Sequence, residues 1–182
     1  MNNIKVVISG DFKRIYPKGL SLVIRIKNII TKDITYIKWK YIKSMRISNS
    51  LEYNNNVFNN LKKIIYDRKK NKYGMLLGYE IYSNKIGKGL CLYHNGPIVI
   101  NKNCIIGDNC SLHGDNCIGN DGIDNDCPII GNNVEIGVGA KIIGKVKIAN
   151  GVTIGAGAVV VNDILEENSV VVGIPAKIIK KK

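Results

Sequence analysis

Aliphatic residues recur every six positions along the second half of this chain, with small and polar residues between them. A step of six from Ile100 to Val160 meets an aliphatic side chain at ten of eleven positions, and Asp124 is the exception. This period fits neither an amphipathic helix nor an alternating strand. It is typical of a triangular solenoid in which each hexad forms one short strand and three hexads complete a coil. The pattern therefore predicts a mainly β solenoid with a narrow aliphatic core.

The first hexads are out of phase with the later ones. Ile86, Leu92 and Ile98 keep the step of six but are displaced by two residues, and the displacement falls just after His94. Equivalent positions of neighbouring coils are therefore expected three hexads apart, with two further positions added across the displacement. By this rule position 114 is expected directly above His94, with His113 beside it.

Helical spacing replaces the hexads in the first part of the chain. Residues 34–45 carry apolar side chains three or four positions apart, and Asp33 before them is a suitable N-cap. Residues 57–65 repeat this spacing in a helix expected to stop near Gly74. We expect the two apolar stripes to pack against each other and against the first coil. Residues 1–30 are ambiguous, and their segment IKVVIS is compatible with a strand.

These patterns divide the chain into three parts. Residues 1–78 are predicted to form a mostly helical, basic N-terminal region. Residues 79–164 form the hexad solenoid, from which segment 119–128 is extruded as a loop. Residues 165–182 leave the repeat as a strand and a basic tail.

Positive charge is concentrated in the helical part. The formal net charge is +13, and residues 1–75 carry 17 Lys and Arg against four Asp and Glu. Such an excess indicates either contact with phosphates or a solvated, lysine-rich helix surface. No nucleic-acid-binding motif accompanies the charge, so we expect no nucleic acid partner, and a weak contact with a membrane surface is left open. Because no apolar run approaches about 18 residues and no signal-peptide pattern is present, we expect a cytoplasmic protein.

The cysteines and the acidic loop both raise the question of a metal. None of the five cysteines forms a CxxC pair, and the spacing of Cys104 and Cys110 equals the repeat period. We therefore interpret them as small apolar core residues and expect no metal. The three aspartates of loop 119–128 alternate with Gly and Asn, which suits turn formation as well as a cation site.

Several segments carry a resemblance to a known family. The hexads, together with IGKGLCLYHNGPIVIN at 86–101 and VVVGIPAKIIKK at 170–181, resemble the hexapeptide-repeat acyltransferases. Within that superfamily the chain is similar to the serine acetyltransferase branch, and most to members associated with bacterial surface-polysaccharide biosynthesis. The resemblance implies a left-handed parallel β-helix, preceded here by a small α-helical region. It covers residues 79–182 well and the helical part only in general form.

His94 is the candidate general base. An alcohol attacks a thioester poorly unless a base takes its proton, and a neutral imidazole with a pKa near about 6.5 suits this task. The resemblance implies the same role for His94, and it implies that Glu80 orients the base, with a one-residue gap in the match. Two departures from serine acetyltransferases matter. Tyr93 replaces an aspartate that helps to hold serine there, and Cys127 replaces a second histidine.

The remaining site residues follow from motif position. Tyr93 and His113 are candidates for acceptor binding, although a solvent-facing corner position is an equal alternative for His113. The resemblance places Val138 and Ala156 beside the pantetheine arm of acetyl-CoA. Lys177 and Lys180 would meet the CoA phosphates, a role that suits lysine ammonium groups.

These residues predict an acetyl-CoA-dependent O-acetyltransferase that acts as a homotrimer. Its acceptor is predicted to be a hydroxyl of a sugar or polysaccharide precursor. Two alternatives stay open: a serine O-acetyltransferase of cysteine biosynthesis, and a non-catalytic β-helix that binds a partner or forms a scaffold.

Overall fold

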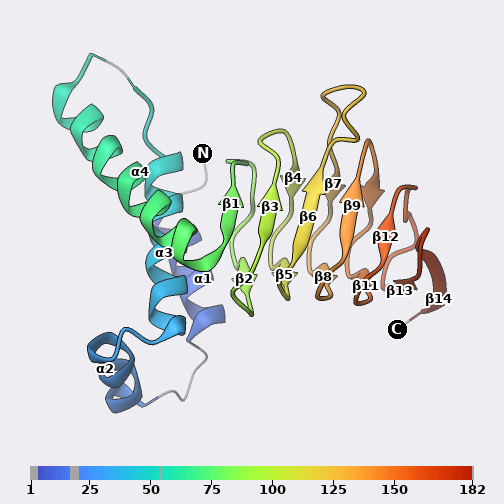
Figure 1. Ribbon diagram of the computed structural model, residues 1–182, viewed down its shortest axis with the longest axis horizontal. Helices are drawn as coiled ribbons and strands as arrows, with labels where there is room; N and C mark the ends of the chain where they lie inside the picture. Colours follow the sequence, from blue (N-terminus) through green and yellow to red (C-terminus); the bar gives the residue numbers. More distant parts are fainter. Residues whose placement is uncertain (1–3, 17–20, 54, 182) are drawn as a thin grey trace. The chain divides into compact units, whose positions relative to one another are not determined.

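The computed structural model describes residues 4–16, 21–53 and 55–181. The chain divides into two compact units, Met1–Leu77 and Gly78–Lys182. The first unit is built of helices and the second of short strands arranged in successive coils (Figure 1).

The described part of the first unit contains four helices. They are α1 (Ile4–Ile15), α2 (Leu22–Ile30), α3 (Ile34–Asn49) and α4 (Val57–Leu77). The predicted N-cap of α3 is confirmed, because Asp33 Oδ1 accepts a hydrogen bond from the Thr35 backbone N–H at 2.8 Å. The strand alternative for IKVVIS is wrong. These residues begin α1, which places Val7 and Asp11 one helical turn apart on a buried face.

The core of this unit gathers around α3. Tyr41, Ile42 and Met45 are buried almost completely. Arg46 lies on the same helix and donates hydrogen bonds from Nε and Nη2 to the two carboxylate oxygens of Asp11, at 2.8 and 3.2 Å. This two-pronged geometry satisfies a carboxylate that would otherwise be buried as an unpaired charge.

The prediction for the second apolar stripe is wrong. Val57, Leu61, Ile64 and Ile65 are all exposed, between 44 and 75 %. Helical spacing shows that these residues share a face of α4, but it does not show whether another element of the chain covers that face. The helix also continues past Gly74 and ends at Leu77.

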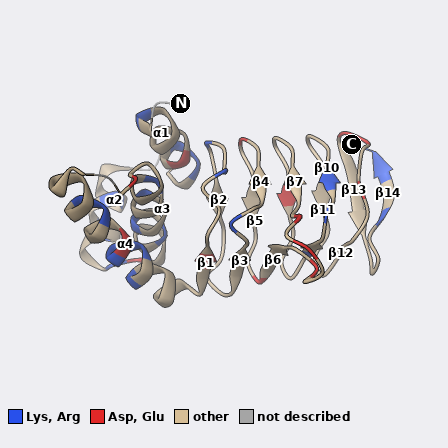
Figure 2. Ribbon diagram, turned by 90° about the horizontal axis from the view of Figure 1, so that it is seen from above, with Lys and Arg blue, Asp and Glu red and all other residues tan. Residues whose placement is uncertain are grey.

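Basic side chains are spread over all four helices, with few acidic ones between them (Figure 2). None of the helices described in the structure is both long enough and apolar enough to span a membrane.

The second unit is a prism with three parallel faces. One sheet has the order β1-β3-β6-β9-β12, a second β10-β7-β4, and the third β14-β13-β11-β8-β5-β2. The strands of the first sheet are β1 (Tyr79–Ile81), β3 (Ile98–Ile100), β6 (Asn116–Gly119), β9 (Lys141–Ile143) and β12 (Val159–Val160). Those of the second are β4 (Ile105–Ile106), β7 (Ile129–Ile130) and β10 (Lys147–Ile148). Those of the third are β2 (Cys91–Leu92), β5 (Ser111–Leu112), β8 (Glu135–Ile136), β11 (Thr153–Ile154), β13 (Ser169–Val172) and β14 (Lys177–Lys181).

The hexad prediction of a β solenoid is confirmed. The aliphatic hexad positions are buried, and Cys104 and Cys110 fill the core with them. The register repeats at the predicted steps. Ile136 pairs with Ile154, three hexads on, and Leu92 pairs with Leu112, where the displacement is added to the three hexads.

Two details of the solenoid depart from the regular step. Ile105 pairs with Ile129, a step of four hexads and not three, because the coil between them includes the extruded loop. The basic tail is a strand, since β14 pairs antiparallel with β13 and extends the third sheet.

Candidate active site

His94 lies at a corner of the prism, two residues beyond the inward-pointing Leu92 of β2. Its side chain is exposed, and it lines a cavity of about 450 Å³. The other residues lining this cavity are His113, Glu135, Gly137, Val138, Thr153, Ile154, Gly155 and Ala156. The volume lies in the range typical of small-molecule sites.

The candidate base and the candidate pantetheine contacts share one corner of the prism. The registers of Leu92, Leu112, Ile136 and Ile154 place His94, Gly114, Val138 and Ala156 at the same position of four successive coils. Backbone hydrogen bonds follow this column, from Gly139 N–H to Gly114 O at 2.9 Å and from Gly157 N–H to Val138 O at 2.8 Å.

Distances along the column follow from the coil spacing. Neighbouring parallel strands are about 4.8 Å apart, so Val138 lies roughly 10 Å from His94 along the prism axis. Val138 and Ala156 are both exposed.

Three polar side chains gather next to this column. The rings of Tyr93 and His113 are stacked, with centroids 4.4 Å apart and planes 13° apart. His113 Nε2 and Glu135 Oε1 lie at 3.0 Å, a hydrogen-bonded ion pair when the imidazole is protonated. The structure thus brings both candidate acceptor-binding residues together, one of them in the same cavity as His94.

Tyr79 is a neighbour of His94 that sequence reasoning missed. This residue of β1 is buried, and its Oη donates a hydrogen bond to the His94 backbone oxygen at 2.8 Å. The bond holds the backbone that presents the imidazole. A tyrosine among alternating hydrophobic residues gave no signal of this contact, which depends on the close approach of β1 to the corner.

Glu80 is exposed on β1 and does not line the cavity. Its Oε2 accepts a hydrogen bond from Tyr82 Oη at 3.4 Å. Orientation of the base by Glu80 stays a prediction. The carboxylate that lines the cavity is that of Glu135.

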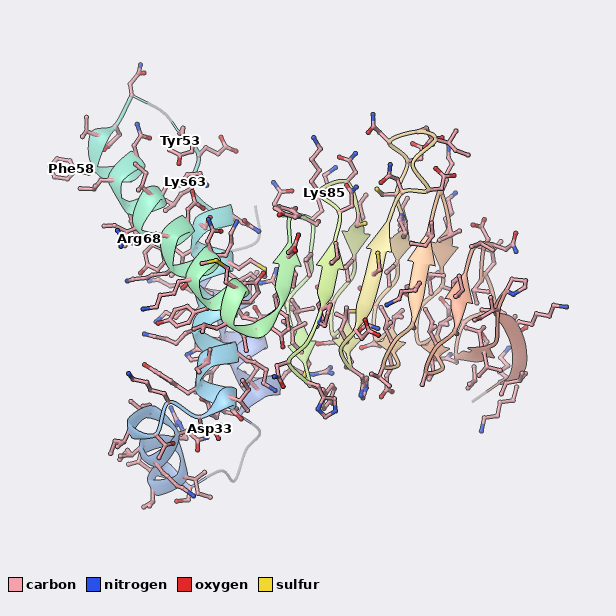
Figure 3. All side chains as sticks on the ribbon, in the orientation of Figure 1. Asp33, Tyr53, Phe58, Lys63, Arg68 and Lys85 are labelled. Atoms are coloured by element: carbon pink, nitrogen blue, oxygen red, sulfur yellow. The ribbon has the colours of Figure 1, made fainter. Side chains whose placement is uncertain are left out.

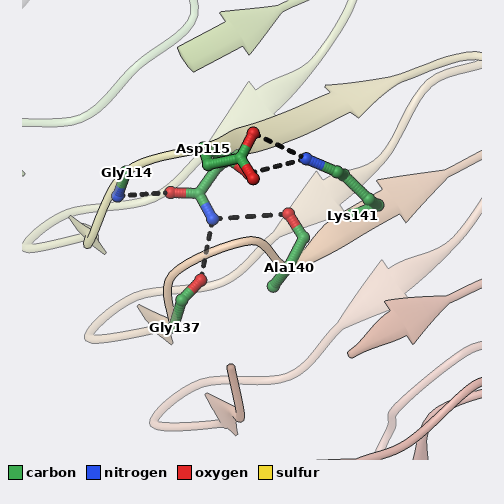
Figure 4. A network of polar contacts seen from close by, with 6 residues as sticks. Gly114, Asp115, Gly137, Ala140 and Lys141 are labelled. Carbon is green, nitrogen blue, oxygen red and sulfur yellow. Dashed lines mark hydrogen bonds and ion pairs between the residues drawn. The ribbon is translucent and has the colours of Figure 1, made fainter. Parts of the chain in front are cut away.

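Asn116 fastens the corner to the next coil (Figure 4). This side chain is buried; its Oδ1 accepts from Gly114 N–H at 3.0 Å, and its Nδ2 donates to the carbonyls of Gly137 and Ala140 at 2.8 and 3.3 Å. One side chain therefore fixes the turns that follow His113 and Gly137. Such a buried amide has one signal in the sequence, a polar residue at the first position of a predicted strand.

Lys141 adds a second tie at the same corner. Its Nζ donates to the backbone oxygen of Asp115 at 2.7 Å and lies 3.2 Å from Asp115 Oδ1 (Figure 4). Because both side chains are largely exposed, the ion pair itself stabilises the fold little, and its role is to position the turn.

Lys177 and Lys180 lie on β14, where both are exposed. They pair with Val172 and Val170 of β13. The third sheet therefore runs from the strand before His94, through the strands that carry the candidate pantetheine contacts, to the two lysines.

The loop aspartates act as turn formers. Asp121 and Asp124 each accept a hydrogen bond from the backbone N–H two residues further on, at 2.9 and 2.6 Å. Asp126 instead pairs with Lys145 at 2.6 Å, and this carboxylate raises the pKa of Lys145.

Cys104 is held as a thiol inside the prism. Burial raises its pKa to about 12, and the neighbouring Cys127 adds to the effect. A thiol with this pKa is a poor nucleophile, which agrees with a packing role.

The comparisons with known proteins support this architecture. Residues 127–162 match the model of the bacterial transferase hexapeptide repeat. The colanic acid biosynthesis acetyltransferase WcaB of Escherichia coli K12 is 43 % identical over 73 residues, which cover 39 % of this chain and 45 % of that protein. The serine acetyltransferase of Staphylococcus aureus Mu50 is 40 % identical over 74 residues, which cover 39 % of this chain and 35 % of that protein.

A solved structure shows the same fold over nearly the whole chain. The serine acetyltransferase of Brucella abortus S19 in complex with coenzyme A superposes with a TM-score of 0.72 at 22 % identity, over 97 % of this chain and 68 % of that one. The chain spans less than half the length of the curated relatives it matches. On its repeat and its fold, this chain is a serine acetyltransferase-like hexapeptide-repeat protein.

Proposed function

We propose that this protein transfers the acetyl group of acetyl-CoA directly to a hydroxyl of a sugar or polysaccharide precursor, with His94 as general base. The observation that carries the proposal is the column formed by His94, Val138 and Ala156, which puts an exposed imidazole and two small exposed corners along one cavity.

The chemistry requires one proton acceptor and a close thioester. Neutral His94 takes the proton of the acceptor hydroxyl while its oxygen attacks the acetyl carbonyl. The bond between carbonyl carbon and sulfur then breaks, and CoA leaves as a thiolate that takes up the proton. Because a thiol has a pKa of about 8.5, this leaving group needs little acid assistance. General base catalysis of this kind accelerates a reaction by about 10²- to 10⁴-fold.

The residues along the cavity fit acetyl-CoA. Glycines at 137 and 155 leave the corner backbone accessible, which suits hydrogen bonds to an amide-bearing arm. At the far end of the same sheet, Lys177 and Lys180 supply positive charge for phosphates. The coenzyme A complex of the Brucella protein, which has this fold, is a further support.

A sugar acceptor is supported by two observations. The relative with 43 % identity is named for colanic acid biosynthesis, which concerns a polysaccharide. The position that holds an aspartate in serine acetyltransferases is Tyr93 here.

L-serine is the second candidate acceptor, since the Staphylococcus relative is a serine acetyltransferase. Rates of CoA release with L-serine and with sugars, measured side by side, decide between the two.

The proposal includes a homotrimer, in which a neighbouring prism completes the groove beside His94. The exposure of Tyr93, Val138 and Ala156 in the single chain is consistent with such a neighbour. Light scattering on the purified protein tests this part independently of activity.

The central experiment compares the wild type with His94→Ala and His94→Asn. Replacing the base is expected to lower kcat by about 10²- to 10⁴-fold. Binding of acetyl-CoA, measured by titration calorimetry, is expected to stay within about threefold of the wild type, a change below about 1 kcal/mol. Added imidazole should restore part of the rate in His94→Ala.

The proposal fails if His94→Ala keeps the full rate of transfer, or if the wild type does not bind acetyl-CoA. A protein that binds no acetyl-CoA and transfers nothing would instead agree with the alternative of a non-catalytic β-helix.

A further inference from the structure

The stacked pair of Tyr93 and His113 forms a fixed aromatic wall in the cavity. The two rings come from equivalent positions of adjacent coils, with centroids 4.4 Å apart. Glu135 holds the edge of the His113 ring through the 3.0 Å contact at Nε2. A ring held by a stacking partner on one face and a carboxylate at its edge is not free to turn about its side-chain bonds.

The coils beyond His113 leave space in front of this wall. At the register of Tyr93 and His113 they place Gly137 and Gly155, neither of which has a side chain. A Cβ on Gly137 would stand 2.6 Å from the Ala156 nitrogen, and one on Gly155 would stand 2.7 Å from a Val172 methyl carbon. The close approach of the next coil therefore requires glycine at both positions, and the space over them remains part of the cavity.

An unpaired hydroxyl lies on the lining of this space. Thr153 Oγ1 is buried and has no hydrogen-bond partner in the part of the chain that the structure describes. Buried hydroxyl groups are nearly always paired with protein, water or a ligand. The atom therefore indicates that a polar molecule completes the cavity.

The charge of the lining excludes one class of acceptor. The residues that line the cavity include one carboxylate and two imidazoles but no lysine or arginine. An amino acid would place its own carboxylate near Glu135 without a permanent cation beside it, which is unfavourable. A neutral ligand avoids this cost.

Glu135 also retains capacity to bind such a ligand. Its Oε1 faces His113, whereas Oε2 has no partner among the described residues. An ionised carboxylate oxygen accepts hydrogen bonds strongly, and hydroxyl groups are suitable donors.

We propose that Tyr93, His113 and Glu135 form the acceptor subsite and that it takes a neutral pyranose. The apolar face of the sugar ring lies on the His113 imidazole, and a ring hydroxyl donates to Glu135 Oε2. A second hydroxyl reaches His94, because Gly114, the residue after His113, lies beside the base. The inference rests on the proposed acetyl transfer and specifies its acceptor.

The test measures acceptor kinetics with defined probes. Initial rates of CoA release are recorded with the methyl pyranosides of glucose, galactose and mannose, and with L-serine. His113→Ala and Tyr93→Ala remove the wall and should raise the KM of the best pyranoside by about three- to tenfold, with the dissociation constant of acetyl-CoA unchanged.

Three further variants separate the roles. His113→Phe keeps a flat ring and should retain most of the affinity, which a proton-transfer role for His113 would not allow. Glu135→Gln keeps the shape of the side chain and should raise KM without lowering the affinity for acetyl-CoA. Phe58→Ala removes an aromatic side chain on the surface of α4 (Figure 3) and should leave both constants unchanged.

Each result bears on the inference. An unchanged KM in folded His113→Ala and Tyr93→Ala overturns it. So does a wild type that acetylates L-serine faster than every pyranoside, or that binds acetyl-CoA but acetylates no pyranoside, and both outcomes leave the use of acetyl-CoA standing. Failure to bind acetyl-CoA at all is a different result, because it removes the proposed function itself.

Discussion

Gly114 lies directly beside His94 in the next coil of the prism. A Cβ built on Gly114 would stand 3.4 Å from the Cβ of His94 and 3.7 Å from its backbone oxygen. Gly114 also has a φ of +109°, a conformation that residues with side chains rarely adopt. The absence of a side chain at position 114 therefore sets how much room the imidazole has.

Gly114→Val is expected to lower kcat/KM by at least about tenfold, because branched methyl groups would displace the proposed base from its position. Steady-state kinetics measures the effect. Gly122→Val is the matched control, since Gly122 also has a positive φ but nothing lies within 4 Å of a Cβ there. Equal losses in the two variants would show that backbone strain, and not crowding of His94, is responsible.

Tyr79→Phe is expected to destabilise the fold by about 0.5–1.5 kcal/mol, because it removes the hydrogen bond from Tyr79 Oη to the His94 backbone oxygen. A smaller kcat should accompany the loss, since the freed backbone carries the base. Urea unfolding and initial rates measure the two effects. Tyr53→Phe serves as control, because Tyr53 is exposed and its Oη makes only a long 3.4 Å contact with Asp67. If kcat is unchanged in Tyr79→Phe, the bond has a structural role alone.

The paired substitution Lys177→Ala and Lys180→Ala is expected to weaken acetyl-CoA binding by about tenfold at low ionic strength, through the loss of two charges near the phosphates. The wild-type affinity should also fall as salt rises, and more steeply than that of the double variant. Calorimetric titrations at several salt concentrations measure both slopes. Acetyl-CoA affinities that match at every salt concentration would exclude these lysines from phosphate binding.

The raised pKa of Cys104 predicts a loss of stability in alkali. Its folded pKa of about 12 exceeds the ordinary value of 9.0, so the unfolded chain releases the proton first. The contribution is therefore complete below pH 9 and is lost as the pH rises toward 12, at no more than about 1.4 kcal/mol per pH unit for one proton. Unfolding of the wild type and Cys104→Ala between pH 8 and pH 11 measures the difference. Parallel stability profiles for the two proteins would contradict the prediction.

Most of the solenoid was predictable because its rule is local. Burial of one aliphatic residue in every six requires a short strand per hexad, and three faces per coil then determine which positions of successive coils lie above one another. That rule predicted correctly that Gly114 lies beside His94 and that His113 is next to it. It also identified Cys104 and Cys110 as core residues.

The rest of the site depended on contacts that no local rule specifies. Glu135 reaches His113 only because the extruded loop lengthens the coil between them by one hexad, and the length of such a loop does not follow from a hexad count. The contact of Tyr79 with the His94 carbonyl depends on how β1 meets the corner.

By itself, therefore, the amino-acid sequence determined the repeat, the inward and outward faces and the position of the candidate base. Only the tertiary structure decided which carboxylate, hydroxyl and aromatic ring surround that base. The physical reason is that core burial acts at every hexad and repeats along the chain, whereas each polar contact forms once, between residues brought together by the stacking of coils.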